Sequence, residues 1–425
     1  PPRSTQGVSS AASDVYKRQT QRILNFLSKI GHPQKKINNI VHVTGTNGKG
    51  STIEFIRSCL NANKLTSNVF TSPHLLRVNE RFIIQNKVIG DNLLSSVIEK
   101  CNEFYSDQEL SFFEFFTVCA FELFSKNLSD FNIFEVGIGG LHDPTNVMAK
   151  KDLSIITTIS YDHEELLGND LEMIACEKLG IIPEGGLAIF GPQDNSIKHL
   201  INKYLIEKNA RGFFYEKDWF IERDDNSIIY RDEGGKLEFE LLGLNGGFQI
   251  FNAGLCIASL RLLKRYNKIE IDDETIITGL RSAKLNGRLS KLTGNTNSWI
   301  TNDSEILIDG CHNPSAAKVI RNEMIEANIN NKKNLLIILG LKKNKKLESF
   351  LVNFRDIAKE ITIVPIKGSD SASLLDLKNI NLFENTILKE ASSLKEAINS
   401  YSKYQNSRIL ICGSLYLVSE ALSID

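Results

Sequence analysis

The sequence lacks long apolar runs, closely spaced cysteine pairs and an excess of charge of either sign. No uninterrupted apolar stretch approaches the roughly 18 residues that suggest a transmembrane helix, so we expect no association with a membrane. Fifty basic residues stand against 51 acidic ones, which gives a formal net charge of −1. Because such a chain has no bulk attraction for polyanions, we also expect no nucleic-acid partner.

The seven cysteines are widely separated and form no C-x-x-C pair. This pattern argues against a disulfide framework and against zinc held by cysteines, and it fits a reducing, cytoplasmic location. Residues 1–19 are rich in serine and alanine but contain no apolar segment of the kind found in secretory signals. We interpret residues 1–19 as a disordered or foreign extension.

What the sequence does contain is an alternation of short apolar runs with longer segments of helical character. With 425 residues, the chain is long enough for two or three domains. Strands are predicted at 40–43, 68–71, 131–136, 153–159 and 187–190, and helices near 51–62, 91–105, 112–126 and 171–181. Because this alternation is typical of a parallel sheet covered on both faces, we predict an α/β fold.

A second alternation begins after Arg288, beyond a stretch of different character. Residues 212–243 interleave aromatic and charged side chains around the turn Asp232-Glu-Gly-Gly235, which predicts a small antiparallel sheet. Further strands are predicted at 305–309, 334–340, 360–365 and 408–413. We therefore predict an N-terminal P-loop ATPase domain with a mostly parallel sheet (residues 20–285) and a smaller, Rossmann-like α/β domain (residues 286–425).

The clearest motif is Val41-His-Val-Thr-Gly-Thr-Asn-Gly-Lys-Gly-Ser51, in which an apolar strand leads through a glycine-rich loop into a helix. Glycines let successive N–H groups face one anion, and the helix N-terminus adds its positive dipole end. The spacing differs from the standard phosphate-binding loop because Gly50 separates Lys49 from Ser51. A turn without function is the alternative, but the order of the parts favours a triphosphate site with Lys49 near the β- and γ-phosphates.

Two side chains follow predicted strands at the edge where parallel sheets bind ligands. Glu135 ends one strand, and its carboxylate suits Mg²⁺, although a solvated strand end is the alternative. His163 follows another strand and could bind a metal or a phosphate, or have no such role. In the second domain, Asp309-Gly-Cys-His-Asn-Pro314 places a carboxylate, an imidazole and an amide on one loop, with a structural turn as the alternative.

Lys178 continues an apolar stripe formed by Leu171, Ile174 and Ala175 at helical spacing. Burial lowers the pKa of a lysine, and a neutral amine can act as a base, form a Schiff base or react with CO₂ to give a carbamate. The alternative is a lysine that extends to solvent at the end of its helix. The pattern leaves these readings open.

These motifs, in this order, resemble the folylpolyglutamate synthase/dihydrofolate synthase family within the Mur ligase superfamily. The resemblance spans roughly residues 20–422 and rests on segments 45–51, 71–81, 112–115, 135–140, 143–146, 162–163, 167–168, 177–181, 286–288, 309–314 and 413–416. Segment 71–81 separates this family from the cell-wall Mur ligases. Where the family usually has arginine, leucine and alanine, this chain has Leu141, His142 and Pro144, so details of the substrate pocket should differ.

The resemblance implies an ATP- and Mg²⁺-dependent ligase that joins L-glutamate to dihydropteroate or a reduced folate through an acyl phosphate, with ATP between the two domains. The implied ATP contacts are Asn47, Gly48, Lys49, Gly50, Ser51, Asn252, Arg288 and Asp309. The implied magnesium ligands are Ser72, Glu135 and His163, and Lys178 matches a lysine carbamylated by CO₂. Phe113, His142, Asp143 and Pro144 match the pterin pocket, and His312 and Ser414 the glutamate site.

Among these residues, Lys49, His163, Lys178 and Arg288 are the implied catalytic ones, and we expect a monomer. Two alternatives remain. A Mur-type ligase acting on a UDP-sugar peptide would need an N-terminal UDP-binding domain, whereas only about 40 residues precede the glycine-rich loop, fewer than a usual domain. A non-catalytic ATP-binding protein would leave Lys178 and the loop at 309–314 without a role.

Overall fold

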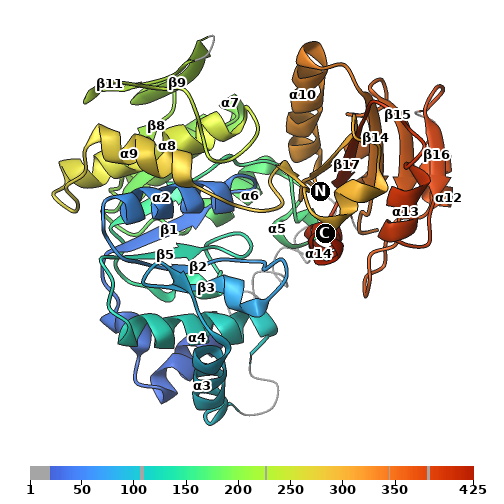
Figure 1. Cartoon of the computed structure of the whole chain (residues 1–425). Helices are drawn as coiled ribbons and strands as arrows, with labels where there is room; N and C mark the ends of the chain where they lie inside the picture. Colours follow the sequence, from blue (N-terminus) through green and yellow to red (C-terminus); the bar gives the residue numbers. More distant parts are fainter. Residues whose placement is uncertain (1–19, 106–109, 225–226, 344, 381–382) are drawn as a thin grey trace, which may run out of the picture. The chain divides into compact units, whose positions relative to one another are not determined.

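The computed structural model describes residues 20–105, 110–224, 227–343, 345–380 and 383–425, so the extension predicted at 1–19 lies outside the described residues. The chain divides into two compact units (Figure 1). The first runs to Gly243 and includes Gln249–Ala283, and the second comprises Leu244–Phe248 and Lys284–Asp425. In the described part of the chain, none of the helices combines the length and apolarity that a bilayer crossing demands.

The short segment Leu244–Phe248 belongs to the second unit, although it lies within the range 20–285 that the sequence assigns to the first domain. The backbone N–H groups of Gly247 and Phe248 donate to the two carboxylate oxygens of Glu323, over 2.9 and 3.3 Å. Glu323 belongs to the second unit, so these bonds attach the segment there. Its sequence carries no sign of this, since the acceptor lies about 75 positions further along the chain.

An eight-stranded sheet forms the centre of the first unit, in the order β4-β3-β2-β5-β1-β6-β7-β8 (Figure 1). The strands are β1 Ile40–Thr44, β2 Ser67–Phe70, β3 Phe82–Ile84, β4 Lys87–Val88, β5 Phe131–Glu135, β6 Leu153–Ile156, β7 Leu187–Phe190 and β8 Arg211–Phe214. From β2 to β8 all neighbours pair in parallel, and β3 and β4 add an antiparallel edge. The central strands are buried along their whole length, so the predicted, mostly parallel sheet is confirmed.

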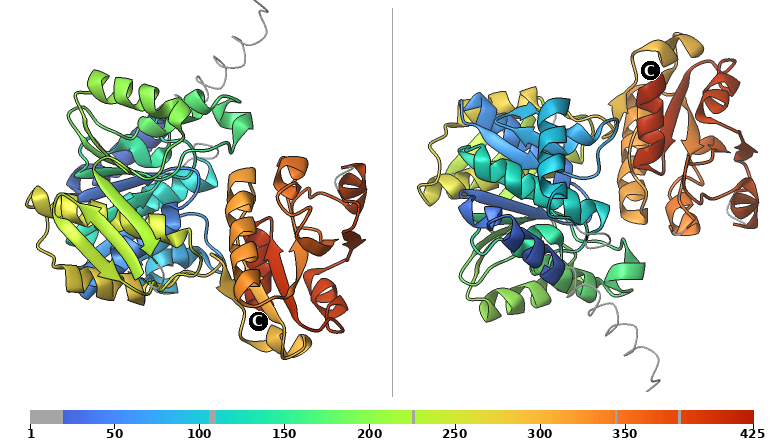
Figure 2. Two further views of the ribbon diagram at one scale, coloured as in Figure 1. Left: turned by 90° about the horizontal axis from the view of Figure 1, so that it is seen from above. Right: turned by 90° about the horizontal axis from the view of Figure 1, so that it is seen from below.

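Helices cover both faces of this sheet; Figure 1 and the view from below in Figure 2 show α3 and α4 on the face opposite α2, α8 and α9. The helices are α2 Lys49–Ala62, α3 Asp91–Asn102, α4 Phe112–Lys126, α5 Glu164–Leu167, α6 Leu171–Leu179, α7 Asn195–Glu207, α8 Gln249–Arg265 and α9 Asp273–Ser282, with 3₁₀ turns η1 Pro33–Lys36, η2 Val78–Arg81 and η3 Pro144–Val147. Helix α4 starts with a reciprocal cap, in which Ser111 N–H donates to the Glu114 carboxylate over 2.6 Å and Glu114 N–H donates to the Ser111 hydroxyl over 3.4 Å. This cap fixes where α4 begins, next to the predicted substrate residue Phe113.

The predicted antiparallel excursion is present as β9 Trp219–Asp224, β10 Ser227–Asp232 and β11 Gly235–Phe239 (Figure 2, left). It packs on α8, where a Cβ at Gly254 would stand 2.7–2.8 Å from the side chains of Trp219 and Ile221. Residues 212–214 were predicted within this excursion, but they lie in β8 and pair in parallel with β7. Phe214 of β8 stacks on Phe190 of β7, with ring centroids 4.7 Å apart. This stacking stabilises residues 211–214 as a further strand of the large sheet.

A six-stranded sheet forms the second unit, in the order β12-β13-β17-β14-β15-β16. The strands are β12 Ser290–Lys291, β13 Glu305–Ile308, β14 Asn334–Leu339, β15 Ala358–Ile363, β16 Ile387–Glu390 and β17 Ser407–Cys412; the helices are η4 Asn295–Trp299, α10 Pro314–Asn330, α11 Leu347–Leu351, α12 Leu374–Asn379, α13 Leu394–Ser400 and α14 Leu415–Ile424. All pairs are parallel except β12 with β13. The four predicted strands are present, whereas β16 was missed because an exposed edge strand has no continuous apolar run.

Candidate nucleotide and substrate site

Four neighbouring strands of the first unit gather the predicted site residues at one edge of the sheet. Strands β2, β5, β1 and β6 lie side by side and run in parallel, so their carboxyl ends share that edge. Ser72 follows β2, Glu135 ends β5, the glycine-rich loop at 45–48 follows β1, and His163 follows β6. Ligands bind at this edge in open α/β sheets.

The glycine-rich loop needs glycine at two positions. Gly45 and Gly48 have φ angles of 141° and 90°, which side chains rarely adopt. A Cβ on Gly45 would stand 1.8 Å from Thr157 Oγ1, and one on Gly48 would stand 2.4 Å from Asn252 Oδ1. The structure therefore brings Asn252, a predicted ATP contact from α8, against the loop that begins α2.

Two lysines converge on one carbonyl oxygen of this loop. Lys49 Nζ donates to the carbonyl of Gly45 over 3.1 Å and to that of Thr46 over 3.3 Å. Lys178 Nζ, from α6, donates to the same Gly45 oxygen over 3.1 Å. Two amines are thus aimed at the point where an apolar strand meets a helix N-terminus, and such a helix end is an anion-binding site.

Lys178 is only 5% exposed, so the alternative of a lysine extending to solvent is wrong. Helix α6 buries Leu171, Ile174 and Ala175 together with Lys178, as the apolar stripe predicted. Burial, with a smaller contribution from the charge of Lys49, lowers the pKa of Lys178 to about 7. A substantial fraction of Lys178 is therefore a neutral, nucleophilic amine near neutral pH.

The predicted magnesium ligands lie at the ends of three of these strands. Ser72 N–H donates to Glu135 Oε2 over 2.9 Å, which holds these two residues together, and Glu135 is 5% exposed. His163 precedes α5 with a φ of 52°, and its ring nitrogens lie 4.0 Å from carboxylate oxygens of Asp162 and Glu165. Among the residues that the structure describes, no group of three or more His, Cys, Asp or Glu side chains could hold a metal alone.

Ser72 and Glu135 nevertheless suit Mg²⁺ better than a metal ion whose ligands all come from the protein. A serine hydroxyl and a buried carboxylate are hard oxygen ligands, and Mg²⁺ keeps several waters and binds phosphate oxygens at its other positions. Glu135 ends the strand next to β1, and Ser72 follows the strand beyond it, so both lie on the β5 and β2 side of the glycine-rich loop, where such phosphates would lie. The residues present are therefore suited to a magnesium ion shared with a nucleotide.

Two of the predicted pterin-pocket residues, Phe113 and Asp143, meet at Gly137. A Cβ there would stand 2.6 Å from the ring of Phe113 and 3.3 Å from Asp143 Oδ2. Phe113 stacks on Phe70, with ring centroids 5.8 Å apart. Pro144 is buried, whereas His142 is half-buried beside it. Burial raises the pKa of Asp143 despite the hydrogen bonds that its carboxylate accepts.

In the second unit, Arg288 and Asp309 also lie together. Asp309 accepts from Leu289 N–H and from Cys311 N–H, each over 2.8 Å. Burial raises the pKa of Asp309, and the neighbouring Arg288 guanidinium opposes this rise. Arg288 Nη1 lies 2.8 Å from where a Cβ on Gly310 would stand. The loop that follows β13 therefore presents a carboxyl group and a guanidinium at the carboxyl end of the second sheet.

His312 and Ser414 occupy the same end of this second sheet. His312 Nδ1 lies 2.9 Å from the carbonyl oxygen of Gly310. Ser414 follows β17, the parallel neighbour of β13, and its hydroxyl accepts from Tyr416 N–H over 3.0 Å to cap α14. The structure thus brings together the four predicted residues of the second unit, namely Arg288, Asp309, His312 and Ser414.

Sequence reasoning did not single out His42 or Lys151, both of which lie behind the Asp143 loop. His42 is fully buried in the middle of β1, and its Nε2 lies 2.8 Å from Thr145 Oγ1. Burial lowers the pKa of Lys151 to about 7. An imidazole inside an otherwise apolar strand was the available signal for His42, whereas Lys151 lies in a loop without any periodic pattern.

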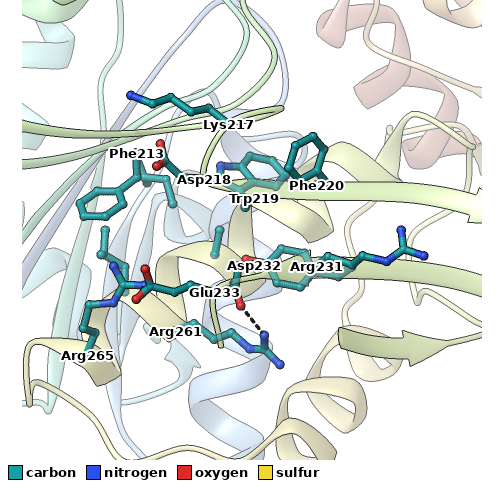
Figure 3. Close-up of a pocket in the computed structure, with 14 residues that line it drawn as sticks. Phe213, Lys217, Asp218, Trp219, Phe220, Arg231, Asp232, Glu233, Arg261 and Arg265 are labelled. Carbon is teal, nitrogen blue, oxygen red and sulfur yellow. Dashed lines mark hydrogen bonds and ion pairs between the residues drawn. The ribbon is translucent and has the colours of Figure 1, made fainter. Parts of the chain in front are cut away.

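A separate cavity of about 410 Å³ lies between α8, β9 and β10 (Figure 3). Its aromatic wall includes Trp219, and two ion pairs lie in its lining: Arg261 lies 2.7 Å from Asp232, and Arg265 pairs with Glu233. None of the predicted site residues lines it. The cavity is therefore distinct from the candidate site.

Comparisons with known proteins agree with this geometry. A family model described as "Mur ligase middle domain" matches residues 43–260, and one described as "Dihydrofolate synthetase, C-terminal domain" matches residues 293–424. The dihydrofolate synthase/folylpolyglutamate synthase of Bacillus subtilis is 30% identical over 94% of this chain and 93% of its own length. The dihydrofolate synthetase of Saccharomyces cerevisiae is 29% identical over 95% and 96%.

Solved structures are similar over almost the whole chain. The E. coli FolC structure in complex with DHPP and ADP has a TM-score of 0.83 at 26% identity, covering 95% of this chain and 92% of that one. A bifunctional folylpolyglutamate synthase/dihydrofolate synthase with Mn, AMPPNP and L-glutamate bound has a TM-score of 0.82 at 27% identity, covering 95% and 93%. The predicted combination of two α/β domains is the fold of these proteins.

Proposed function

This chain belongs to the folylpolyglutamate synthase/dihydrofolate synthase family, a family of ATP-dependent amide-forming ligases, and from that premise we propose that it joins L-glutamate to the carboxylate of dihydropteroate or of a reduced folate. The observation that carries the proposal is the convergence of Lys49 and Lys178 on the carbonyl oxygen of Gly45, beside a helix N-terminus. That arrangement suits a triphosphate and a second anion, which are what this reaction requires.

ATP is the proposed phosphoryl donor, bound by the loop after β1 and the first turn of α2. The proposed contacts there are Asn47, Gly48, Lys49, Gly50, Ser51 and Asn252, with Arg288 and Asp309 as contacts from the second unit. Lys49 provides a positive charge for the β- and γ-phosphates, and its bonds to two backbone carbonyls hold it in place before the nucleotide arrives. Ser72, Glu135 and His163 would hold Mg²⁺, which neutralises charge on the phosphates when it is bound.

The chemistry follows from the low reactivity of a free carboxylate. Its oxygen attacks the γ-phosphorus, the bond to ADP breaks, and an acyl phosphate forms. The amine of L-glutamate then attacks the acyl carbon, phosphate leaves with the bonding electrons, and the nitrogen loses a proton to give the amide. Lys49 and Arg288 are the proposed stabilisers of charge on the transferred phosphoryl group, whose charge is spread over three oxygens.

Lys178 is the proposed site of a carbamate. The neutral amine attacks CO₂, forms an N–C bond and loses a proton, which leaves an anionic group at the end of the side chain. The lowered pKa of Lys178 supports this step, because only the unprotonated amine is nucleophilic. The neighbouring Lys49 ammonium would stabilise the product through its opposite charge.

Different residues are proposed to bind the pterin end of the first substrate and to bind L-glutamate. Phe113, His142, Asp143 and Pro144 are the proposed contacts of the pterin end, supported by the approach of Phe113 and Asp143 to Gly137. His312 and Ser414 are the proposed contacts of glutamate.

A monomer is the proposed active form. Light scattering on the purified protein tests this proposal.

The test is to incubate the protein with ATP, Mg²⁺, L-glutamate and either dihydropteroate or tetrahydrofolate, and to measure ADP. We expect ADP formation that requires both glutamate and one of the two pterin compounds. The two assays in parallel show whether dihydropteroate, tetrahydrofolate or both are substrates. ADP formed at the same rate without any pterin contradicts the proposal, and ADP formed without glutamate contradicts the ligase assignment.

A further inference from the structure

A buried chain of polar side chains lies behind the loop that carries Asp143. It runs from His42 in the middle of β1, through Thr145 at the start of η3, to the Asp143 carboxylate. His42 Nε2 lies 2.8 Å from Thr145 Oγ1, which lies 2.5 Å from Asp143 Oδ1. His42 and Thr145 are fully buried and Asp143 is 4% exposed, so water does not compete for these contacts.

The direction of each hydrogen bond in this chain follows from the proton inventory. An ionised carboxylate only accepts, so the single hydroxyl proton of Thr145 points to Asp143. The Thr145 oxygen must then accept from His42, which places the imidazole proton on Nε2. His42 Nδ1 is buried and has no hydrogen-bond partner among the residues that the structure describes, which fits a lone pair there and not an N–H group.

The charges around His42 support this neutral state. Burial, and to a smaller extent the charge of Lys151, lowers the pKa of His42 well below its ordinary value. Lys151 Nζ itself donates to the carbonyl of Ile181 over 2.6 Å and to the Asn146 side chain. Asp143 is the other ionisable group of this cluster, and its negative charge raises the pKa of Lys151.

The Asp143 carboxylate is held by four donors within its own loop. Oδ2 accepts from the N–H groups of Gly137 and Ile138 over 3.0 and 3.2 Å, and Oδ1 accepts from the N–H and hydroxyl of Thr145 over 2.9 and 2.5 Å. A carboxylate offers about four acceptor sites. Its plane is therefore set by these bonds, and a ligand N–H group that binds here would replace the longest of them, from Ile138.

We propose that Thr145 and His42 are positioning residues, which hold the Asp143 carboxylate at a fixed angle beside Phe113 so that it recognises a planar heterocycle with N–H donors. The inference rests on the proposed function, in which that heterocycle is the pterin end of the substrate. Neither residue touches the reacting carboxylate or the nucleotide loop in this account. Their loss should therefore affect recognition of the pterin compound and leave the use of ATP unchanged.

Thr145→Val is the primary test, because it removes the hydroxyl and keeps the side-chain shape. We expect the KM for the pterin substrate to rise about tenfold, the loss of one hydrogen bond to a charged group, while kcat and the KM for ATP change less than about twofold. Thr145→Ser, which keeps the hydroxyl, should restore the KM to within about threefold of the parent value. A pterin KM that stays at the parent value, or one that rises together with the KM for ATP, overturns the proposal.

Thr362→Val is the matched control. Thr362 is a buried threonine of the second unit whose hydroxyl lies 2.7 Å from the Tyr401 hydroxyl, so the substitution also removes a buried side-chain hydrogen bond. We expect it to leave the pterin KM unchanged. A pterin KM that rises as much in Thr362→Val as in Thr145→Val would show a general loss of structure and would count against the positioning role.

The tautomer of His42 provides a readout that does not depend on activity. In ¹⁵N-histidine NMR spectra of the full chain, with the His42→Gln variant used for assignment, we expect a neutral ring protonated on Nε2 from pH 6 to 8. A cationic ring, or one protonated on Nδ1, overturns the inference whatever the enzyme does. If this signature is present but the parent protein makes no pterin-dependent ADP, the proposed function fails and the hydrogen-bond chain remains.

Discussion

Lys49 and Lys178 differ from ordinary surface lysines, because their amines share one hydrogen-bond acceptor in the nucleotide loop. Lys49 and Lys178 both donate to the Gly45 carbonyl, and the charge of Lys49 contributes to the lowered pKa of Lys178. Two full positive charges at this spacing are costly in a buried site. The pair is therefore best described as the positive charge of Lys49 beside the amine of Lys178, which loses its proton near neutral pH.

Lys49→Ala removes the positive charge that Lys49 brings to the nucleotide loop. We expect pterin-dependent ADP formation to fall by at least about a hundredfold, as when a group that stabilises transition-state charge is lost. Lys203→Ala is the control, because Lys203 is an exposed lysine on α7, and it should retain the parent rate. Activity of Lys49→Ala close to that of the parent would refute the role of the loop.

Lys178→Ala tests the carbamate through chemical rescue. We expect activity to fall by about a hundredfold in bicarbonate buffer, because the anion would be lost with the amine. Formate or acetate should restore part of it by placing a carboxylate in the vacated space. Chloride at the same ionic strength is the control for general salt effects. A variant that keeps full activity would show that turnover does not need Lys178, and one that carboxylates never rescue would argue that Lys178 acts only as an amine.

At the scale of elements, the position of helix α2 is restricted by the close approach of helix α9. A Cβ on Gly279 of α9 would stand 2.4 Å from the Cα and 2.7 Å from the backbone nitrogen of Cys59 in α2. Backbone atoms cannot move aside as a flexible side chain does. Because α2 carries Lys49 in its first turn, this contact between two helix backbones helps to hold the helix that follows the nucleotide loop.

Gly279→Ala should therefore destabilise the protein although alanine is the better helix former. We expect a loss of about 1–3 kcal/mol in the free energy of unfolding from overpacking, measured by urea denaturation. Thr278→Ala, at the exposed neighbouring position of the same helix, should instead gain up to about 0.5 kcal/mol from helix propensity. Stabilisation by both substitutions would show that α9 can move away from α2.

At the scale of the whole molecule, each unit presents its predicted residues at the carboxyl ends of a largely parallel sheet. The first sheet carries the glycine-rich loop and Glu135, and the second carries Asp309 and Ser414. Both sheets also retain buried ionisable groups that a core built for stability alone would exclude. Lys178 is the clearest case, because its burial costs stability whenever its amine is charged.

The pH dependence of global stability should report that cost in CO₂-free buffer. The pKa of Lys178 is about 7 in the folded protein, against an ordinary value of 10.5. Below pH 7 both folded and unfolded chains are protonated, and the full penalty is present; between pH 7 and 10.5 only the unfolded chain keeps its proton, and the penalty fades as pH rises.

Replacing the amine by an apolar side chain of similar length should remove the penalty. Lys178→Met should therefore be more stable than the parent, by a larger margin at pH 6 than at pH 9, in urea denaturation at both pH values. Lys203→Met, at an exposed position, should show no such difference between the two pH values. An equal gain for Lys178→Met at both would mean that Lys178 is not buried as a charged group.

The sequence by itself determined the class of fold, the strands that are apolar throughout and the glycine-rich loop, whereas it left the burial of Lys178 open. These are local properties, because a period, a run of apolar residues or a glycine at a tight turn acts within a few positions of the chain. Tertiary structure alone decided that segment 244–248 belongs to the second unit, that β8 extends the large sheet, and that Asn252 meets Gly48. It also decided that His42 reaches Asp143 through Thr145, since these residues are about 100 positions apart and hydrogen-bond geometry between such residues follows from packing.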